Sequence, residues 1–162
     1  MDSPAEIFTD WLATTSCKKV FGVPGLQIDP LWFALNDHPD FELICATHEA
    51  SADFMADGYA RQTRNIGVCL TIGSVGLANL AVAILAAKTD HTPILFITGE
   101  APLHIDGYGP FQDTSERGSN DQTWVAPLVK ASIRINSIAS MRTQLEQARE
   151  HALAYPPGPV HI

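Results

Sequence analysis

Apolar positions along the chain switch repeatedly between short continuous runs and spacings of three to four residues. Continuous runs are typical of strands buried in a parallel sheet, and the wider spacing is typical of helices with one apolar face. We expect strands near 19–23, 41–46, 66–72, 93–99, 131–135 and 159–162, a helix starting at Pro4, one carrying Leu31, Trp32 and Leu35, and helices at 49–62, 77–88 and 140–154. This alternation predicts an α/β fold: a doubly wound, six-stranded, mainly parallel sheet with helices on both faces.

Local signals mark where several of these elements begin and end. Ser3-Pro4-Ala5-Glu6 matches a capping box with proline at the first helical position. The turn Gly73-Ser74-Val75-Gly76 joins a strand to the helix at 77–88. Residues 100–120 form a long polar loop, and loops of that length inside a compact domain are usually functional.

Length and composition indicate one globular domain, spanning residues 1–162. Hydrophobic residues make up 46% of the chain and charged residues 17%, enough to bury a sizeable core. The formal net charge of −8 argues against nucleic acid and anionic membranes as partners. The N-terminus lacks a signal-peptide pattern, and the apolar run near 77–87 is too short to cross a bilayer. We therefore expect a cytoplasmic protein.

The cysteines Cys17, Cys45 and Cys69 have no paired spacing of the kind that zinc sites or disulfides use. Two of them lie in apolar runs. The sequence therefore predicts buried, free thiols in a reducing compartment.

Glu49 is the most informative single residue, because it stands where the strand at 41–46 gives way to a helix. A carboxylate there lies at the carboxyl edge of the sheet, where open α/β folds bind ligands. The helix that follows carries small residues that would let another helix approach closely: Ala50, Ala52, Ala56 and Ala60. An acid at a helix start also suits the helix dipole, so a purely structural role is the alternative at this point.

Several general motifs fail on a single residue. A zinc-protease motif beginning at His48 needs a second histidine where Ala52 stands. A hydrolase nucleophile elbow around Ser74 needs glycine where Ile72 stands, and a dinucleotide fingerprint needs glycine where Asn79 stands. No P-loop ending and no cluster of metal ligands occurs, so we expect no metal site on this chain.

Four segments that are ordinary when taken singly have the same position in the predicted fold. Pro24-Gly25, Glu49, the turn at 73–76 and the loop from 100 onward each follow a predicted strand. A parallel sheet brings all of them to its carboxyl edge. We expect the functional site there.

The order of motifs along the chain resembles that of thiamine diphosphate-dependent enzymes. The matching segments are Phe21-Gly22-Val23-Pro24-Gly25, His48-Glu49-Ala50, residues 54–61, Gly67-Val68, Gly76 with Asn79, Asp90 with Pro93, Ile97-Thr98-Gly99 and Phe111-Gln112-Asp113. The chain looks like their N-terminal pyrimidine-binding domain, in the branch of acetolactate synthase, benzoylformate decarboxylase and related 2-oxo acid enzymes. It covers essentially the whole chain.

The resemblance implies a role for Glu49. In this family the corresponding glutamate hydrogen-bonds N1′ of the aminopyrimidine, which favours the imino tautomer that takes the proton from the thiazolium ring. Burial would raise the pKa of such a carboxyl group and help it exchange a proton near neutral pH. The chain would then belong to a lyase or transferase acting on a small 2-oxo acid.

The resemblance also implies roles at the other turns. Pro24 and Gly25 would line the pyrimidine pocket with Gly76 and Asn79 nearby, and Gln112 would point toward substrate. The sequence departs from the family at 74–76, where the usual Gly-Pro-Gly reads Ser-Val-Gly.

The family's diphosphate-binding motif, Gly-Asp-Gly followed by Asn, does not occur in these 162 residues. We therefore expect the pyrimidine end of thiamine diphosphate on this chain, and Mg²⁺ with the diphosphate on a partner domain or subunit in a homo- or hetero-oligomer. The isolated chain should not turn over substrate. Two alternatives remain: a non-catalytic assembly or regulatory module of the same fold, and an unrelated nucleotide-binding α/β domain.

Overall fold

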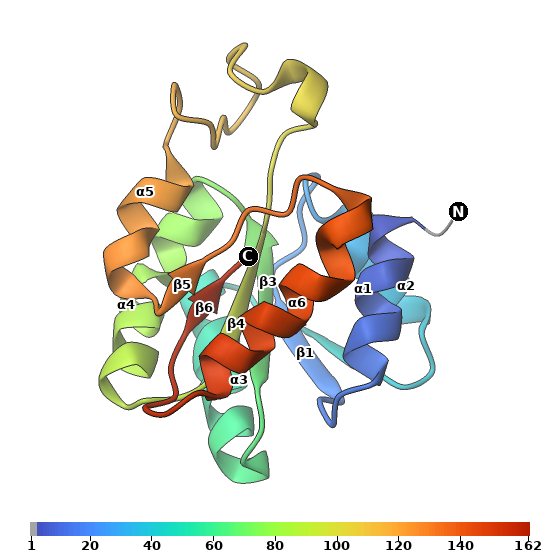
Figure 1. The fold of residues 1–162 in the computed structure, drawn as a ribbon, viewed down its shortest axis with the longest axis vertical. Coiled ribbons are helices and arrows are strands. Elements are labelled where there is room, and N and C mark those ends of the chain that lie inside the picture. Colours follow the sequence, from blue (N-terminus) through green and yellow to red (C-terminus); the bar gives the residue numbers. More distant parts are fainter. Residues whose placement is uncertain (1–2) are drawn as a thin grey trace.

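A computed structural model describes residues 3–162 as one six-stranded sheet with the strand order β2-β1-β3-β4-β6-β5. The strands are β1 Lys19–Gly22, β2 Glu42–Cys45, β3 Gly67–Ile72, β4 Ile94–Gly99, β5 Ala131–Ser132 and β6 Val160–His161. All pairings between them are parallel, as predicted. Their carboxyl ends therefore lie along one edge of the sheet, at the top of Figure 1.

Helices cover both faces of this sheet (Figure 1). They are α1 Pro4–Ala13, α2 Asp29–Asp37, α3 Glu49–Thr63, α4 Val75–Thr89, α5 Asp121–Val125 and α6 Ile138–Leu153, with short 3₁₀ turns η1 Leu103–Ile105 and η2 Ala126–Leu128. Helix α1 packs against α2 and α6 on one face, and α3 packs against α4 on the other. The doubly wound α/β fold predicted from the sequence is confirmed.

The α1/α2/α6 face holds the bulkier core. Phe8, Trp11, Leu12, Leu35 and Leu145 are all almost fully buried in it. The predicted capping box starts α1: Ser3 Oγ accepts from the Glu6 amide at 3.2 Å, and the Ser3 amide donates to Glu6 Oε2 at 2.7 Å.

The α3/α4 face is built from smaller side chains. Ala52, Ala56 and Ala60 of α3 are buried against the sheet. At the start of β3, a Cβ added to Gly67 would lie 2.6 Å from the Ala56 carbonyl oxygen. The helix therefore rests almost directly on the strand, which the alanine spacing favours.

Several element boundaries differ from the prediction, and one helix was not predicted. The strand expected at 131–135 ends at Ser132, because the chain then leaves the sheet edge toward α6. Helix α4 starts at Val75, so the turn before it is shorter than expected. The short helix α5 at the end of the long loop was not predicted, since five residues carry too little periodicity.

The prediction of buried cysteines is right for Cys17 and Cys69 but wrong for Cys45. Cys45 is the last residue of β2, which is an edge strand with no neighbour on its outer side. Its thiol is exposed for that reason. Over residues 3–162, no helix is long and apolar enough to span a membrane.

Candidate functional site

Glu49 and Asn79 meet at the carboxyl edge on the α3/α4 side. Glu49 is the first residue of α3, whose start is capped by His48 Nδ1 accepting from the Ala50 amide at 3.1 Å. Asn79 lies one turn into α4 and donates through Nδ2 to Glu49 Oε2 at 2.8 Å. Within the described chain, Glu49 Oε1 has no hydrogen-bond partner and is free to bind a further group.

Gly25 and Gly76 flank the end of β3, and neither position has room for a side chain. A Cβ at Gly25 would overlap Ile72 Cγ2, and one at Gly76 would overlap the Thr71 hydroxyl. Both glycines therefore let their segments lie directly against the strand end. Both glycines lie at the carboxyl edge predicted from the sequence, and so does Pro24, which is exposed.

The turn between β3 and α4 contains a strained residue. Ser74 has φ +54° and ψ −105°, a region that non-glycine residues rarely adopt. Its amide donates to Asp121 Oδ2 at 2.6 Å, and Asp121 is 1% exposed. The Asp121 carboxylate, which also accepts from Ser119 Oγ, therefore stabilises this turn. Asp121 was not predicted to support the site, because an acidic residue at the end of a polar loop gives no distinctive signal in the sequence.

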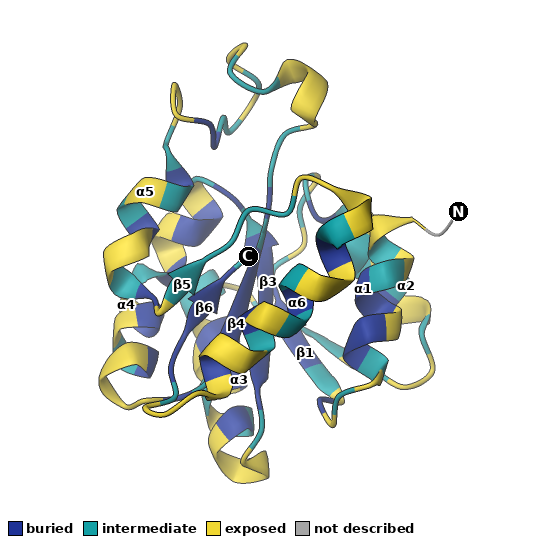
Figure 2. Cartoon of the chain, viewed as in Figure 1, coloured by how far each residue is buried: buried dark blue, intermediate teal, exposed yellow. Residues whose placement is uncertain are grey.

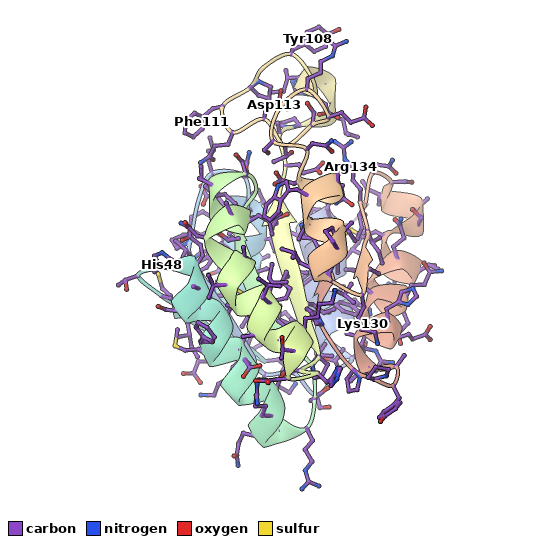
Figure 3. The ribbon with its side chains drawn as sticks, turned by 90° about the vertical axis from the view of Figure 1, so that its left-hand side faces the viewer. His48, Tyr108, Phe111, Asp113, Lys130 and Arg134 are labelled. Carbon is purple, nitrogen blue, oxygen red and sulfur yellow. The ribbon has the colours of Figure 1, made fainter. Side chains whose placement is uncertain are left out.

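The long loop projects beyond this edge (Figure 3), and much of it is solvent-exposed (Figure 2). Tyr108 and Phe111 are 85% and 82% exposed at its outer side. Gln112, in the left-handed region at φ +55°, accepts through its backbone oxygen from Gln27 Nε2 at 3.2 Å. The structure thus joins Gln112 to the segment after Gly25 and not to Glu49.

The base of the same loop is held by a charge cluster. Arg134 donates to Glu100 Oε2 and to Asp106 Oδ2, both at 2.7 Å. All three side chains are partly buried. Burial raises the pKa of Glu100, and the Arg134 guanidinium opposes that shift.

One turn after Glu49, Asp53 is fully buried, and within residues 3–162 neither of its carboxyl oxygens has a hydrogen-bond partner. Burial, with a smaller contribution from Asp57, raises the pKa of Asp53 to about 8. This carboxyl group is therefore mostly neutral at pH 7. The sequence gave no signal for it beyond its place on a helix.

A cavity of about 760 Å³ also opens at this edge, but on the α1/α2/α6 side of the sheet. Its lining includes Gln27, Leu31, Ile97, Arg134 and Met141, and it includes neither Glu49 nor Asn79. The Glu49–Asn79 pair lies instead on the open α3/α4 side. Residues 3–162 contain no group of three or more acidic, histidine or cysteine side chains that could hold a metal ion.

Comparison with known proteins identifies the family. Residues 3–122 match the family model of the thiamine pyrophosphate enzyme N-terminal TPP-binding domain. The chain is 32% identical over 158 residues to a probable acetolactate synthase large subunit of Methanococcus aeolicus, covering 98% of this chain and 25% of that protein. It is also 32% identical to the large subunit of acetolactate synthase isozyme 1 of Escherichia coli, covering 98% and 27%.

Solved structures agree with this match. A candidate thiamin diphosphate-dependent enzyme from Mycobacterium smegmatis superposes with a TM-score of 0.88 at 25% identity, over 99% of this chain and 30% of that one. Benzoylformate decarboxylase from Polynucleobacter necessarius shares the fold, with a TM-score of 0.89 at 24% identity, over 99% of this chain and 29% of that one.

The chain spans about a quarter of the length of the curated relatives that it matches, so those proteins carry further domains. The match nevertheless covers most of the present chain. This chain belongs to the thiamine pyrophosphate enzyme family, as its N-terminal TPP-binding domain.

Proposed function

We propose that this chain is the pyrimidine-binding half of a thiamine diphosphate-dependent 2-oxo acid decarboxylase or carboligase. The observation that carries the proposal is the Glu49–Asn79 pair: one carboxyl oxygen is held at 2.8 Å by the amide and the other is free at the carboxyl edge. A carboxyl oxygen that carries a proton can donate it to a pyrimidine ring nitrogen, which is an acceptor, and the resulting carboxylate can accept it back.

The residues around the pair fit the pyrimidine end of the cofactor. Glu49 would hold or exchange a proton at the ring nitrogen through Oε1, while Asn79 keeps the carboxyl group in one orientation. Pro24, Gly25 and Gly76 would line the ring, since the two glycines leave the backbone bare of side chains. When bound, the cofactor itself supplies the electron sink for cleavage of the 2-oxo acid.

The diphosphate end requires another domain or subunit. Among residues 3–162 no cluster of acidic side chains fits Mg²⁺. We propose that a diphosphate-binding partner holds the metal and that the pair forms a homo- or hetero-oligomer. The outer surface of α3 and α4 supports this, because it exposes Phe54, Met55, Val75, Val82 and Leu85. The substrate would be a small 2-oxo acid, with Gln112 on its side of the site.

The test is Glu49→Gln in the enzyme assembled with its diphosphate-binding partner. Gln keeps the shape of the side chain but cannot exchange a proton, so the rate of 2-oxo acid turnover should fall by on the order of 10²–10⁴. Glu150→Gln on the exposed surface of α6 is the matched control and should leave the rate unchanged.

Full activity in the Glu49→Gln enzyme would refute the role of Glu49. An assembled wild-type complex that never shows cofactor-dependent activity would instead favour a non-catalytic assembly module. Tight binding of NAD or ATP by the lone chain would contradict the family role altogether, and calorimetry measures it directly.

A further inference from the structure

Gln27 lies just after Gly25, in the loop between β1 and α2, and both ends of its side-chain amide are used. Oε1 accepts from the Gly73 amide at 3.1 Å, and Nε2 donates to the backbone oxygen of Gln112 at 3.2 Å. One side chain thus connects three segments of the carboxyl edge. The other two segments lie 46 and 85 residues away from Gln27 in the sequence.

The backbone of Gln27 lies directly against the end of β4. A Cβ added to Gly99 at the end of β4 would lie 2.6 Å from Gln27 Cβ and 2.7 Å from its carbonyl carbon and oxygen. Gly99 therefore provides the space that Gln27 occupies. The Gly73 amide also donates to the Gly99 oxygen at 3.0 Å, so Gln27, Gly73 and Gly99 form one contact group.

The Glu49 carboxyl group does not depend on this group. It is held by Asn79, which comes from α4 and makes no hydrogen bond to Gln27. The two parts of the site therefore have separate supports. One fixes the acid that faces the cofactor, and the other fixes the loop that carries Gln112.

We propose that Gln27 is a positioning residue that fastens the Gln112 loop to the β3–α4 turn, and so controls binding of the 2-oxo acid but not of the cofactor. This inference rests on the proposed function for its catalytic consequence. The attachment itself is a property of this chain alone, and it can be measured without activity.

The attachment is tested on the whole chain with trypsin. Arg117 is exposed in the loop and offers a cleavage site five residues after Gln112. In Gln27→Met the side chain keeps its length but loses both hydrogen bonds. Because only the bond to the Gln112 oxygen holds the loop, cleavage after Arg117 should be about fivefold faster, the effect of losing about one net hydrogen bond. Gln147→Met, at an exposed glutamine of α6, is the matched control.

Gly99→Ala is an independent second variant, because its Cβ would push Gln27 away without changing the amide. It should reproduce the faster cleavage. Gln27→Glu keeps the acceptor for Gly73 but loses the donor to Gln112, so it should also free the loop while leaving the turn in place. Equal cleavage rates in wild type, Gln27→Met and Gly99→Ala would overturn the attachment.

The catalytic consequence is tested in the enzyme assembled with its diphosphate-binding partner. For Gln27→Met we expect KM for the 2-oxo acid to rise about fivefold, with kcat and the Kd of thiamine diphosphate within about twofold of wild type. A parallel loss of cofactor affinity and thermal stability would mean that Gln27 only supports the fold, and would overturn the positioning role. An inactive wild-type complex with faster cleavage in the variants would refute the proposed function and leave the attachment in place.

Discussion

The two faces of the sheet are packed by different kinds of side chain. On the α1/α2/α6 face, large residues such as Phe8, Trp11 and Leu145 fill the space between helices and strands. On the α3/α4 face, alanines such as Ala52 and Ala56 bring the helices close to the sheet and to each other. The first face holds most of the large buried side chains. The second leaves much of its apolar surface outside.

Helix α4 is the clearest case, because it carries large apolar side chains on its outer side as well as on its buried side. Leu80 and Ile84 are buried inward, whereas Val82 is 69% exposed and Leu85 is 47% exposed. Helix α6 on the other face presents charged residues such as Arg142 and Glu150 to solvent. A helix that is apolar on all sides is normally surrounded by protein. The difference between the two faces supports the proposal that another domain or subunit covers the α3/α4 face.

The largest effect on stability should come from the bulkier core on the α1/α2/α6 face. Leu145 is fully buried between α6 and the sheet, so Leu145→Ala should lower the free energy of unfolding by about 2–5 kcal/mol in urea denaturation of the chain. Leu85→Ala, on the exposed side of α4, is the control and should change it by less than about 0.5 kcal/mol. A similar loss for both would break the distinction between the two faces.

The next effect should appear in assembly and not in folding. Val82→Asp places a charge in the centre of the exposed α4 surface, and we expect affinity for the diphosphate-binding partner to fall about 30-fold, or about 2 kcal/mol. Phe33→Asp on α2, which is 61% exposed on the opposite face, should leave affinity unchanged. Sedimentation velocity with the partner measures the affinity of each variant. If Val82→Asp bound the partner as tightly as Phe33→Asp does, α4 would not be the docking surface.

The smallest expected effect is on how the free energy of unfolding depends on pH. Burial raises the pKa of Asp53, on the inner side of α3, to about 8. Burial lowers the pKa of His161, in β6, to about 4. Stability contributed by the protonated Asp53 is full below its unfolded value near 3.8 and is lost as pH rises through about 8. Stability from neutral His161 is full above 6.5 and is lost as pH falls toward about 4.

Below pH 6.5 the two groups change the free energy of unfolding in opposite directions as pH falls. Between pH 6.5 and about 8 only Asp53 of the two contributes a change. There the free energy of unfolding should fall with pH by at most about 1.4 kcal/mol per unit. Asp53→Asn should remove this slope, and Asp10→Asn, at an exposed position of α1, is the control. An unchanged slope in Asp53→Asn would mean that Asp53 is solvated or paired in solution.

Much of the site could be predicted because it depends on chain order. Glu49, Gly25 and Gly76 each follow a strand, and strands in a parallel sheet all end at one edge. Their meeting therefore needs only the alternation of strands and helices. Chain order could not predict that Cys45 is exposed, because its exposure depends on β2 being an edge strand of the sheet.

The connections inside the site could not be predicted in that way. The Asn79–Glu49 bond spans 30 residues and depends on how closely α3 and α4 pack. The bonds of Gln27 depend on Gly99 yielding space at the end of another strand. Strain at Ser74 and its support by Asp121 also involve segments that only the folded chain brings together.

From the sequence, periodicity and motifs within single turns were enough to predict the α/β fold, the edge that carries the proposed site, and Glu49 as the acid proposed for it. Only the folded chain shows which side chains hold that acid and the loop beside it, and which face of the sheet exposes its apolar side chains. Those features arise from contacts between distant segments, and their geometry is set by how closely helices and strands pack.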